Sequence, residues 1–255
     1  MIQEHCRIQS VKEIAPNIFE LSFISQTISE QVIPGQFINV RVEDALLPLL
    51  RRPFSLFSVH APLVSIIFNA IGIGTKLLSQ KKPGEILDII GPLGNGVFPL
   101  DDGGSATALL VAGGLGVATF PFLTSRLLRT ENIFTFIGAR TASQVIRKGL
   151  KNVHVATDDG SEGLHGTVVD LVKAFIAEQA VDAPRIYSCG PMPMMRALAH
   201  FAKEKNIPCY VALECEMACG IGLCQGCPVE TAGSDKKYNL VCKDGPVFDS
   251  RKVNF

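Results

Sequence analysis

Four cysteines near the end of the chain constrain its fold more than any other sequence feature. They follow the pattern Cys219-x4-Cys224-x2-Cys227-x14-Cys242, a spacing typical of plant-type [2Fe–2S] ligation. Three thiolates on one loop can enclose a cluster, and the glycines between them let the backbone approach the inorganic sulfides. A fourth ligand from a distant segment would fasten the tail. The spacing therefore predicts an iron–sulfur site held by these four cysteines.

Two other kinds of site stay open for the same cysteines. Structural zinc sites usually use two close pairs of ligands, whereas here three cysteines share one loop and the fourth stands alone. The C-x2-C pair alone can form a redox-active dithiol, which leaves the other two cysteines without a role. A disulfide framework is not expected, because the N-terminus does not have the pattern of a signal peptide. The remaining thiols are expected to be non-ligands, with Cys6 and Cys209 buried and Cys215 structural.

Composition gives no sign of a nucleic-acid or membrane partner. The chain has 24 Lys plus Arg and 24 Asp plus Glu, so no basic field is expected to attract polyanions. Residues 103–125 carry no charge, and a run of about 20 apolar residues can span a bilayer. The glycines in this run and Pro121 instead predict a strand, a turn and a helix. We therefore expect a cytoplasmic protein without a membrane segment.

Three regions of different texture predict a multidomain α/β plus all-β fold. Residues 1–101 contain short β-branched runs separated by Pro and Gly, which predicts an antiparallel β-barrel. Residues 102–213 alternate strands and helices, which predicts a parallel sheet with helices on both faces. Residues 214–255 are too few to bury a core and need a metal cluster. In the second region the expected helices cover residues 117–130, 142–150, 167–179 and 191–206.

Two turns of the predicted parallel sheet are candidate nucleotide sites. The sequence GGLG at residues 113–116 follows a strand and opens a helix, so its N–H groups can bind a pyrophosphate. A purely structural tight turn explains it equally well, because it is not the G-x-G-x-x-G fingerprint. The sequence CGP at residues 189–191 ends a later strand. Both turns are expected at the carboxyl edge, where parallel sheets bind their ligands.

Two motifs of the predicted barrel are candidates for phosphate binding. They are RRPFS at residues 51–55 and GIGT at residues 72–75. An arginine together with a Ser or Thr hydroxyl on an adjoining element can bind a pyrophosphate. An exposed arginine pair and a plain glycine loop explain the same residues as well.

Seven motifs occur in an order that resembles one protein family. They are RPFS at 52–55, GT at 74–75, GPLGNG at 91–96, GGLG at 113–116, CGP at 189–191, MACGIGLCQGC at 217–227 and VCKDGPVF at 241–248. With them, nearly the whole chain resembles the electron-transfer subunits of dihydroorotate dehydrogenase B, within the ferredoxin-reductase-like flavoproteins. The cysteine segment and the tail are the most specific parts of this resemblance.

The resemblance implies where the cofactors bind. FAD would lie between the barrel and the α/β domain, NAD would dock over the glycine turn, and Cys189 would be the catalytic group near the nicotinamide. The cluster ligands would be the same four cysteines. The residues implied for the flavin are Arg52, Pro53, Phe54, Ser55, Ile67, Phe68, Asn69, Gly74 and Thr75. Those implied for NAD are Gly113, Gly114, Gly116, Gly190 and Pro191.

The resemblance also implies a partner subunit. An FMN-containing catalytic subunit would oxidise dihydroorotate in pyrimidine biosynthesis, and electrons would pass through the [2Fe–2S] cluster and FAD to NAD, in a heterotetramer. A TIM barrel needs about 250 residues, which this chain spends on other domains. A surface around Leu223 and Val247 is the expected contact. Cys215 and Glu216 depart from the family pattern, which can alter the cluster's potential or the partner surface.

Other functions stay open at this point. One is an NAD(P)H-linked flavin and iron–sulfur subunit of a sulfur-reducing, hydrogenase or transhydrogenase complex. Another is a non-catalytic redox-sensing or zinc-binding module. The choice between NAD and NADP is also open, because the loop at residues 138–142 has no acidic residue for a ribose hydroxyl and contains Arg140.

Overall fold

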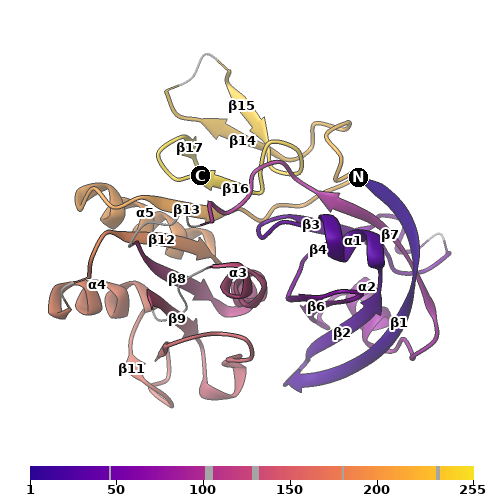
Figure 1. Ribbon diagram of the computed structural model, residues 1–255, viewed down its shortest axis with the longest axis horizontal. Helices are drawn as coiled ribbons and strands as arrows, with labels where there is room; N and C mark the ends of the chain where they lie inside the picture. The colour runs from indigo at the N-terminus through magenta and orange to yellow at the C-terminus, as the bar shows by residue number, and fades with distance from the viewer. Residues whose placement is uncertain (46, 101–105, 128–131, 180, 234–235) are drawn as a thin grey trace.

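Three sheets make up the fold in this computed structural model (Figure 1). The structure describes residues 1–255 except 46, 101–105, 128–131, 180 and 234–235. A parallel sheet with its helices and a curved antiparallel sheet lie side by side, and a small third sheet lies above them in this view. The predicted architecture of barrel, parallel sheet and C-terminal segment is therefore confirmed.

The first sheet is antiparallel and has seven strands in the order β4-β3-β7-β1-β2-β6-β5. Its interior is filled by alternating apolar side chains such as Leu21 and Phe23, both fully buried. The sheet curves so that β4 contacts β6, where the rings of Phe54 and Phe68 lie 5.8 Å apart. Its elements are β1 (Ile2–Ala15), β2 (Ile18–Ile24), α1 (Gln26–Gln31), β3 (Phe37–Arg41), β4 (Arg52–Ser55), β5 (Ser58–His60), β6 (Leu63–Asn69), α2 (Ile73–Ser79) and β7 (Ile86–Leu93).

The second sheet has the order β11-β10-β9-β8-β12-β13-β16, and all pairs are parallel except β13 with β16. Its strands are β8 (Thr107–Gly113), β9 (Ile133–Ala139), β10 (Val153–Thr157), β11 (Leu164–His165), β12 (Pro184–Cys189), β13 (Cys209–Ala212) and β16 (Val247–Asp249). The connecting elements are η1 (Gly114–Thr119), α3 (Phe120–Arg126), η3 (Ala142–Gln144), α4 (Val168–Glu178) and α5 (Met192–Glu204). The central strand β8 is buried along its whole length, as expected between two layers.

Two of the expected helices differ from the structure. The helix predicted over 142–150 is wrong, because only the single turn η3 forms. The chain becomes extended at Val145, and Ile146 packs directly into the core. The segment predicted as a helix over 117–130 begins within the 3-10 turn η1, and α3 starts next to Pro121, whose fixed φ suits a first helical turn. Residues 128–130 lie outside the described part.

The uncharged stretch at 103–125 forms β8, η1 and α3, as predicted for its described residues. Among the described residues, no helix is both long enough and apolar enough to cross a membrane.

The C-terminal segment is fastened to both sheets. It forms the small sheet of β14 (Pro228–Thr231), β15 (Tyr238–Leu240) and β17 (Val253–Asn254), and it returns as β16 to the edge of the second sheet. The loop at residues 94–96 packs against residues 243–247, with Gly96 N–H donating to Gly245 O at 2.9 Å. A Cβ at Gly96 would lie 2.3 Å from Val247 O, so this approach requires glycine.

The predicted domain boundaries are not decided by this arrangement. The boundary at residues 101 and 102 lies outside the described residues. The boundary at 213 and 214 precedes the cysteine segment, although β16 from that segment belongs to the second sheet. The three segments therefore stay a prediction.

Candidate functional site

A cavity of about 330 Å³ lies between the curved sheet and the parallel sheet. The predicted flavin residues on β4, β6 and α2 line one wall: Pro53, Phe54, Ser55, Ile67, Phe68, Asn69 and Thr75. The opposite wall comes from η1 and from the segment after β13: Leu115, Ala118, Leu213, Glu214, Cys215 and Met217. Broad apolar walls with a few hydroxyl, amide and carboxyl groups suit a large planar ligand.

The two remaining flavin residues, Arg52 and Gly74, lie beside this cavity rather than in its lining. Arg52 Nη1 donates to Leu50 O at 2.7 Å, and a Cβ at Gly74 would lie 3.3 Å from Arg52 Nε. The preceding Arg51 is held elsewhere, because its guanidinium bonds the Asp88 carboxylate at 2.5 Å. The pair thus separates into one structural arginine and one arginine next to the cavity.

A second cavity, of about 410 Å³, runs along the carboxyl edge of the parallel sheet. It shares Asn69 and Leu115 with the first cavity, so the two are contiguous. Its lining also includes the glycine turn after β8, and Arg140 and Asp158, which are both exposed. Asp158 follows β10, whereas Arg140 follows β9. The structure therefore supplies the acidic group that the loop at 138–142 lacks.

The two predicted turns meet at this edge. Gly113, Gly114 and Pro191 line the second cavity, and Gly116 and Gly190 line a neighbouring cavity of about 360 Å³. A Cβ at Gly116 would lie 2.2 Å from the carbonyl oxygen of Cys189. This approach holds η1 against the end of β12, and only glycine allows it.

Cys189 is 2% exposed and does not line these three cavities, but it bonds a residue that does. Its thiol donates to Glu214 Oε1 at 3.9 Å, and Glu214 lines both the first cavity and the cavity at the glycine turn. Burial, followed by the neighbouring Glu214 carboxylate, raises the pKa of Cys189 well above its usual value. The predicted catalytic thiol is therefore in contact with the site through a carboxyl group.

Glu214 is exposed to solvent where it lines the first cavity and the cavity at the glycine turn. Protein atoms surround the rest of its carboxyl group. This burial raises the pKa of Glu214, and the hydrogen bond from Cys189 opposes the shift. Sequence reasoning missed Glu214, although the rule that ligands bind at carboxyl ends of parallel strands applies to β13 as well as to β8 and β12.

The cysteine loop directs backbone N–H groups at its sulfur atoms. Cys219 Sγ accepts from the N–H groups of Ile221 at 3.5 Å and Cys224 at 3.4 Å, and Cys224 Sγ accepts from Gly226 at 3.4 Å. Burial acts to raise the pKa of Cys219, but these N–H groups lower it to about 6. A loop that stabilises thiolates in this way is suited to binding metal.

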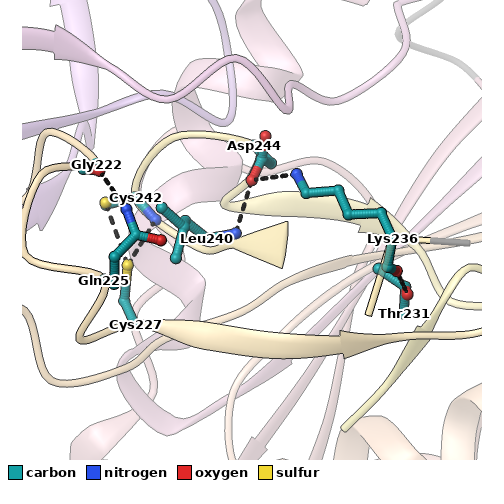
Figure 2. A network of polar contacts seen from close by, with 8 residues as sticks. All are labelled: Gly222, Gln225, Cys227, Thr231, Lys236, Leu240, Cys242 and Asp244. Atoms are coloured by element: carbon teal, nitrogen blue, oxygen red, sulfur yellow. Dashed lines mark hydrogen bonds and ion pairs between the residues drawn. The ribbon is translucent and has the colours of Figure 1, made fainter. Parts of the chain in front are cut away.

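The other two cysteines meet beneath this loop. The Sγ atoms of Cys227 and Cys242 lie 3.1 Å apart, and the N–H of Cys242 points at Cys227 Sγ. Figure 2 shows the Asp244 carboxylate nearby, which accepts from the N–H of Leu240 at 2.7 Å and from Lys236 at 3.1 Å. These bonds fix the turn that presents Cys242.

The donor set fits an iron–sulfur cluster. Four thiols are present, and N–H groups point at three of their sulfurs. Among the described residues, no group of three or more His, Cys, Asp or Glu side chains is arranged so that it could hold a metal ion. The fit to a [2Fe–2S] cluster rests on the four thiols, their spacing along the chain and the N–H groups directed at their sulfurs.

Of the two residues predicted on the partner surface, one is exposed and the other is buried. Leu223, on the cysteine loop, is 77% exposed, but Val247 is only 4% exposed because β16 pairs with β13. The predictions that Cys6 and Cys209 are buried thiols are confirmed.

Sequence comparisons agree on one family. The family model for the iron–sulfur cluster binding domain of dihydroorotate dehydrogenase B matches residues 214–254. The electron transfer subunit of dihydroorotate dehydrogenase B (NAD(+)) from Geobacillus sp. (strain WCH70) is 40% identical over 261 residues, covering 99% of each chain. The protein of the same name from Bacillus velezensis is 39% identical over 263 residues, again covering 99% of each chain.

Solved structures show the same fold. The structure of an NADH-dependent reduced ferredoxin-NADP oxidoreductase superposes with a TM-score of 0.84 and 30% identity, covering 98% of this chain and 89% of that one. A ferredoxin NADP+ reductase from Neisseria gonorrhoeae with bound FAD and NADP gives a TM-score of 0.60 at 16% identity, covering 79% of this chain and 91% of that one. The second likeness concerns the fold alone.

Proposed function

The chain belongs to the family of electron-transfer subunits of dihydroorotate dehydrogenase B, and we propose that it carries electrons from an FMN-containing catalytic subunit to NAD. It does so through a [2Fe–2S] cluster and FAD. The cluster exchanges single electrons, nicotinamide accepts a hydride, and a flavin can do both. The chain itself supplies the positions of these groups and the walls that exclude water between them.

The observation that carries this proposal is the contact between three sites. The first cavity shares Asn69 and Leu115 with the second, and its wall includes Cys215 and Met217, which pack against the core that contains the cluster cysteines. FAD in the first cavity would therefore lie between NAD in the second cavity and the cluster. This is the order that the transfer of electrons requires.

The predicted residues have defined roles in this arrangement. The Phe54 and Phe68 side of the first cavity would contact the flavin, and Ser55, Thr75 and Arg52 would bind its polar part. The N–H groups at the glycine turn would bind the pyrophosphate of NAD. The cluster ligands would be Cys219, Cys224, Cys227 and Cys242.

Asp158 supports NAD as the nucleotide. The second cavity shares residues with the flavin cavity, and its lining extends to Arg140 and Asp158, which follow the strands one and two places from β8 in the sheet. The nicotinamide must lie at the flavin end, so the adenosine ribose lies at the other. There a carboxylate accepts hydrogen bonds from ribose hydroxyls and repels a 2′-phosphate.

We further propose three functional segments: residues 1–101 for FAD, 102–213 for NAD and 214–255 for the cluster. The catalytic partner would complete a cytoplasmic heterotetramer. The buried thiol of Cys189 would influence the nicotinamide site through its hydrogen bond to Glu214.

The test is an absorption spectrum of the purified chain, with iron and sulfide assays on the same sample. Flavin and cluster bands that bleach on addition of NADH are expected, while dihydroorotate without the partner should leave them unchanged. Cys224→Ala should remove the cluster bands, and the matched control Cys6→Ala, which removes a buried thiol of the first sheet, should keep them. A chain that binds zinc, or no flavin after reconstitution, would refute the proposal.

A further inference from the structure

Asn39 is a buried polar residue on the strand of the first sheet that faces the cysteine loop. It lies in the middle of β3 and is only 1% exposed. Its neighbours Ile38 and Val40 belong to the core inside the curved sheet, so Asn39 points to the opposite face of the strand. Phe37 lies on that face too, and it packs in the core that contains the cluster cysteine Cys242. The C-terminal segment therefore covers this face of β3.

The side-chain amide of Asn39 contacts the first ligand of the cysteine loop. Its Nδ2 donates to the carbonyl oxygen of Cys219 at 3.3 Å, and the two residues are 180 positions apart in the chain. The next residue, Gly220, has a φ of +68°, and a Cβ there would lie 2.4 Å from Asn39 Nδ2. The amide thus fits closely against the backbone of Cys219 and Gly220, and only glycine allows this approach.

The oxygen of the same amide has no partner. Asn39 Oδ1 is buried and accepts no hydrogen bond from the described residues. Burying an unpaired amide oxygen costs stability that an apolar side chain in this place would not lose. Reversing the amide would set this oxygen against the carbonyl oxygen of Cys219, so the bond to the cysteine loop fixes its orientation. The packing of β3 does not require this polar side chain, which points to a role at the loop.

We propose that Asn39 is a positioning residue for the iron–sulfur cluster, which fixes the Cys219 end of the cysteine loop on the sheet that lines the flavin cavity. The inference rests on the proposed function, because it takes Cys219 as a cluster ligand. Hydrogen-bond partners of ligand residues orient those residues and adjust the metal centre. Asn39 pairs with Pro53, which lines the flavin cavity. The strand β3 therefore joins the flavin wall to the backbone of a cluster ligand.

The amide also has an electrostatic effect on the cluster. Its N–H end carries a partial positive charge and is directed at the Cys219 residue. Reduction adds negative charge to the cluster, and a fixed dipole with its positive end toward the ligand residue stabilises that charge. Removal of the amide is therefore expected both to loosen the ligand loop and to lower the reduction potential.

The experiment compares Asn39→Ala and Asn39→Leu in the complete chain with FAD bound. Two quantities are measured: the rate at which a chelator removes iron, and the midpoint potential of the cluster from a titration followed by electron paramagnetic resonance. Asn39→Ala should release iron about 10–100-fold faster, the range that loss of such a partner costs in metal affinity, and should have a lower midpoint potential. Asn39→Leu fills the space without a donor, so it should show both changes as well.

The matched control is Asn152→Ala. It removes another side-chain amide that donates to a backbone carbonyl, that of Ile133 at 2.8 Å, but in the second sheet. Iron release and midpoint potential should stay at the values of the unmodified chain. A general loss of stability, measured as a fall in melting temperature, is thereby separated from an effect on the cluster.

Two results would overturn the inference. One is iron release and a midpoint potential in Asn39→Ala equal to those of the unmodified chain. The other is restoration of both by Asn39→Leu, which would show that the position needs to be filled and that the amide has no role. Iron and sulfide content of the unmodified chain separates the two proposals: without a cluster the proposed function itself fails, whereas a cluster that Asn39→Ala leaves unaltered rejects only the role of Asn39.

Discussion

Replacing Gly116 by alanine should disable the proposed NAD site while leaving FAD and the cluster in place. Gly116 lies in η1, directly against the end of β12. An added Cβ would be 2.2 Å from the carbonyl oxygen of Cys189, 2.4 Å from its carbonyl carbon and 2.7 Å from the nitrogen of Gly190. All three are backbone atoms, so no side chain can rotate away to make room.

The size of the effect follows from how firmly these atoms are held. A real Cβ essentially never approaches within 3.0 Å, so the two backbones must separate by at least 0.8 Å, the difference between 3.0 and 2.2 Å. Cys189 cannot move alone, because it pairs with Ala112 on one side and Ala212 on the other. Overpacking of this kind costs about 1–3 kcal/mol of stability, and a displacement of about 1 Å in a positioning element can cost about 100-fold in rate.

The assay is NADH oxidation with ferricyanide as acceptor. Gly116→Ala should lower kcat/KM by about 100-fold at unchanged flavin and iron content per chain. Gly84→Ala is the matched control: its φ of +93° strains an L-residue, but a Cβ there meets no atom within 4 Å and Gly84 lies outside the site. It should cost about 1–2 kcal/mol of stability and leave kcat/KM intact. A Gly116→Ala enzyme with kcat/KM within about twofold of the unmodified chain would refute the reasoning from this contact.

Two further predictions concern the ends of the nucleotide path. Asp158→Asn removes a carboxylate from the proposed adenosine end of the second cavity, so the ratio of kcat/KM for NADPH to that for NADH should rise at least about tenfold. The added change Arg140→Ala should reverse this gain, and an unchanged ratio in the single variant would show that Asp158 does not select the nucleotide. At the other end, burial raises the pKa of Glu214 from 4.5, so the folded chain binds a proton that the unfolded chain has released. Stability should therefore be highest below pH 4.5 for this group and decline as pH rises toward its folded pKa. Glu214→Gln should flatten that part of the dependence of melting temperature on pH, and an identical decline in both proteins would contradict the titration of Glu214.

Much of the fold was predictable because short patterns of neighbouring residues specify its strands and helices. Alternating apolar residues identify strands such as β2 and β6, and the regular exchange of strands and helices identifies the parallel sheet. The helix expected over 142–150 is wrong because tertiary packing of Ile146 outweighs local propensity. The placement of β16 depends on contacts between segments far apart in the chain, which periodicity does not report. For the same reason Val247 was expected at the surface.

The site was predictable where its chemistry is concentrated in short motifs. The spacing from Cys219 to Cys242 specifies the kind of metal centre, and the last three residues of the RPFS motif line the proposed flavin cavity. Glu214 and Asp158 were missed because each is a single acidic residue after a strand. Such a residue becomes informative only when the fold brings it to the edge of a cavity that other segments form.

The segment from Leu213 to Cys227 joins all three proposed centres in chain order. Leu213 is fixed by its N–H bond to Pro246 O at 2.9 Å, and the next residue, Glu214, lines both the flavin cavity and the cavity at the glycine turn. Cys215 then lies between the flavin cavity and the cluster cysteines. Substitutions in this segment should therefore affect two centres together, whereas those on β4 or β6 should affect the flavin first. In the proposed arrangement this segment runs from the nucleotide side to the cluster, the reverse of the direction of the electrons, so a small shift of one stretch of backbone would change both transfer steps.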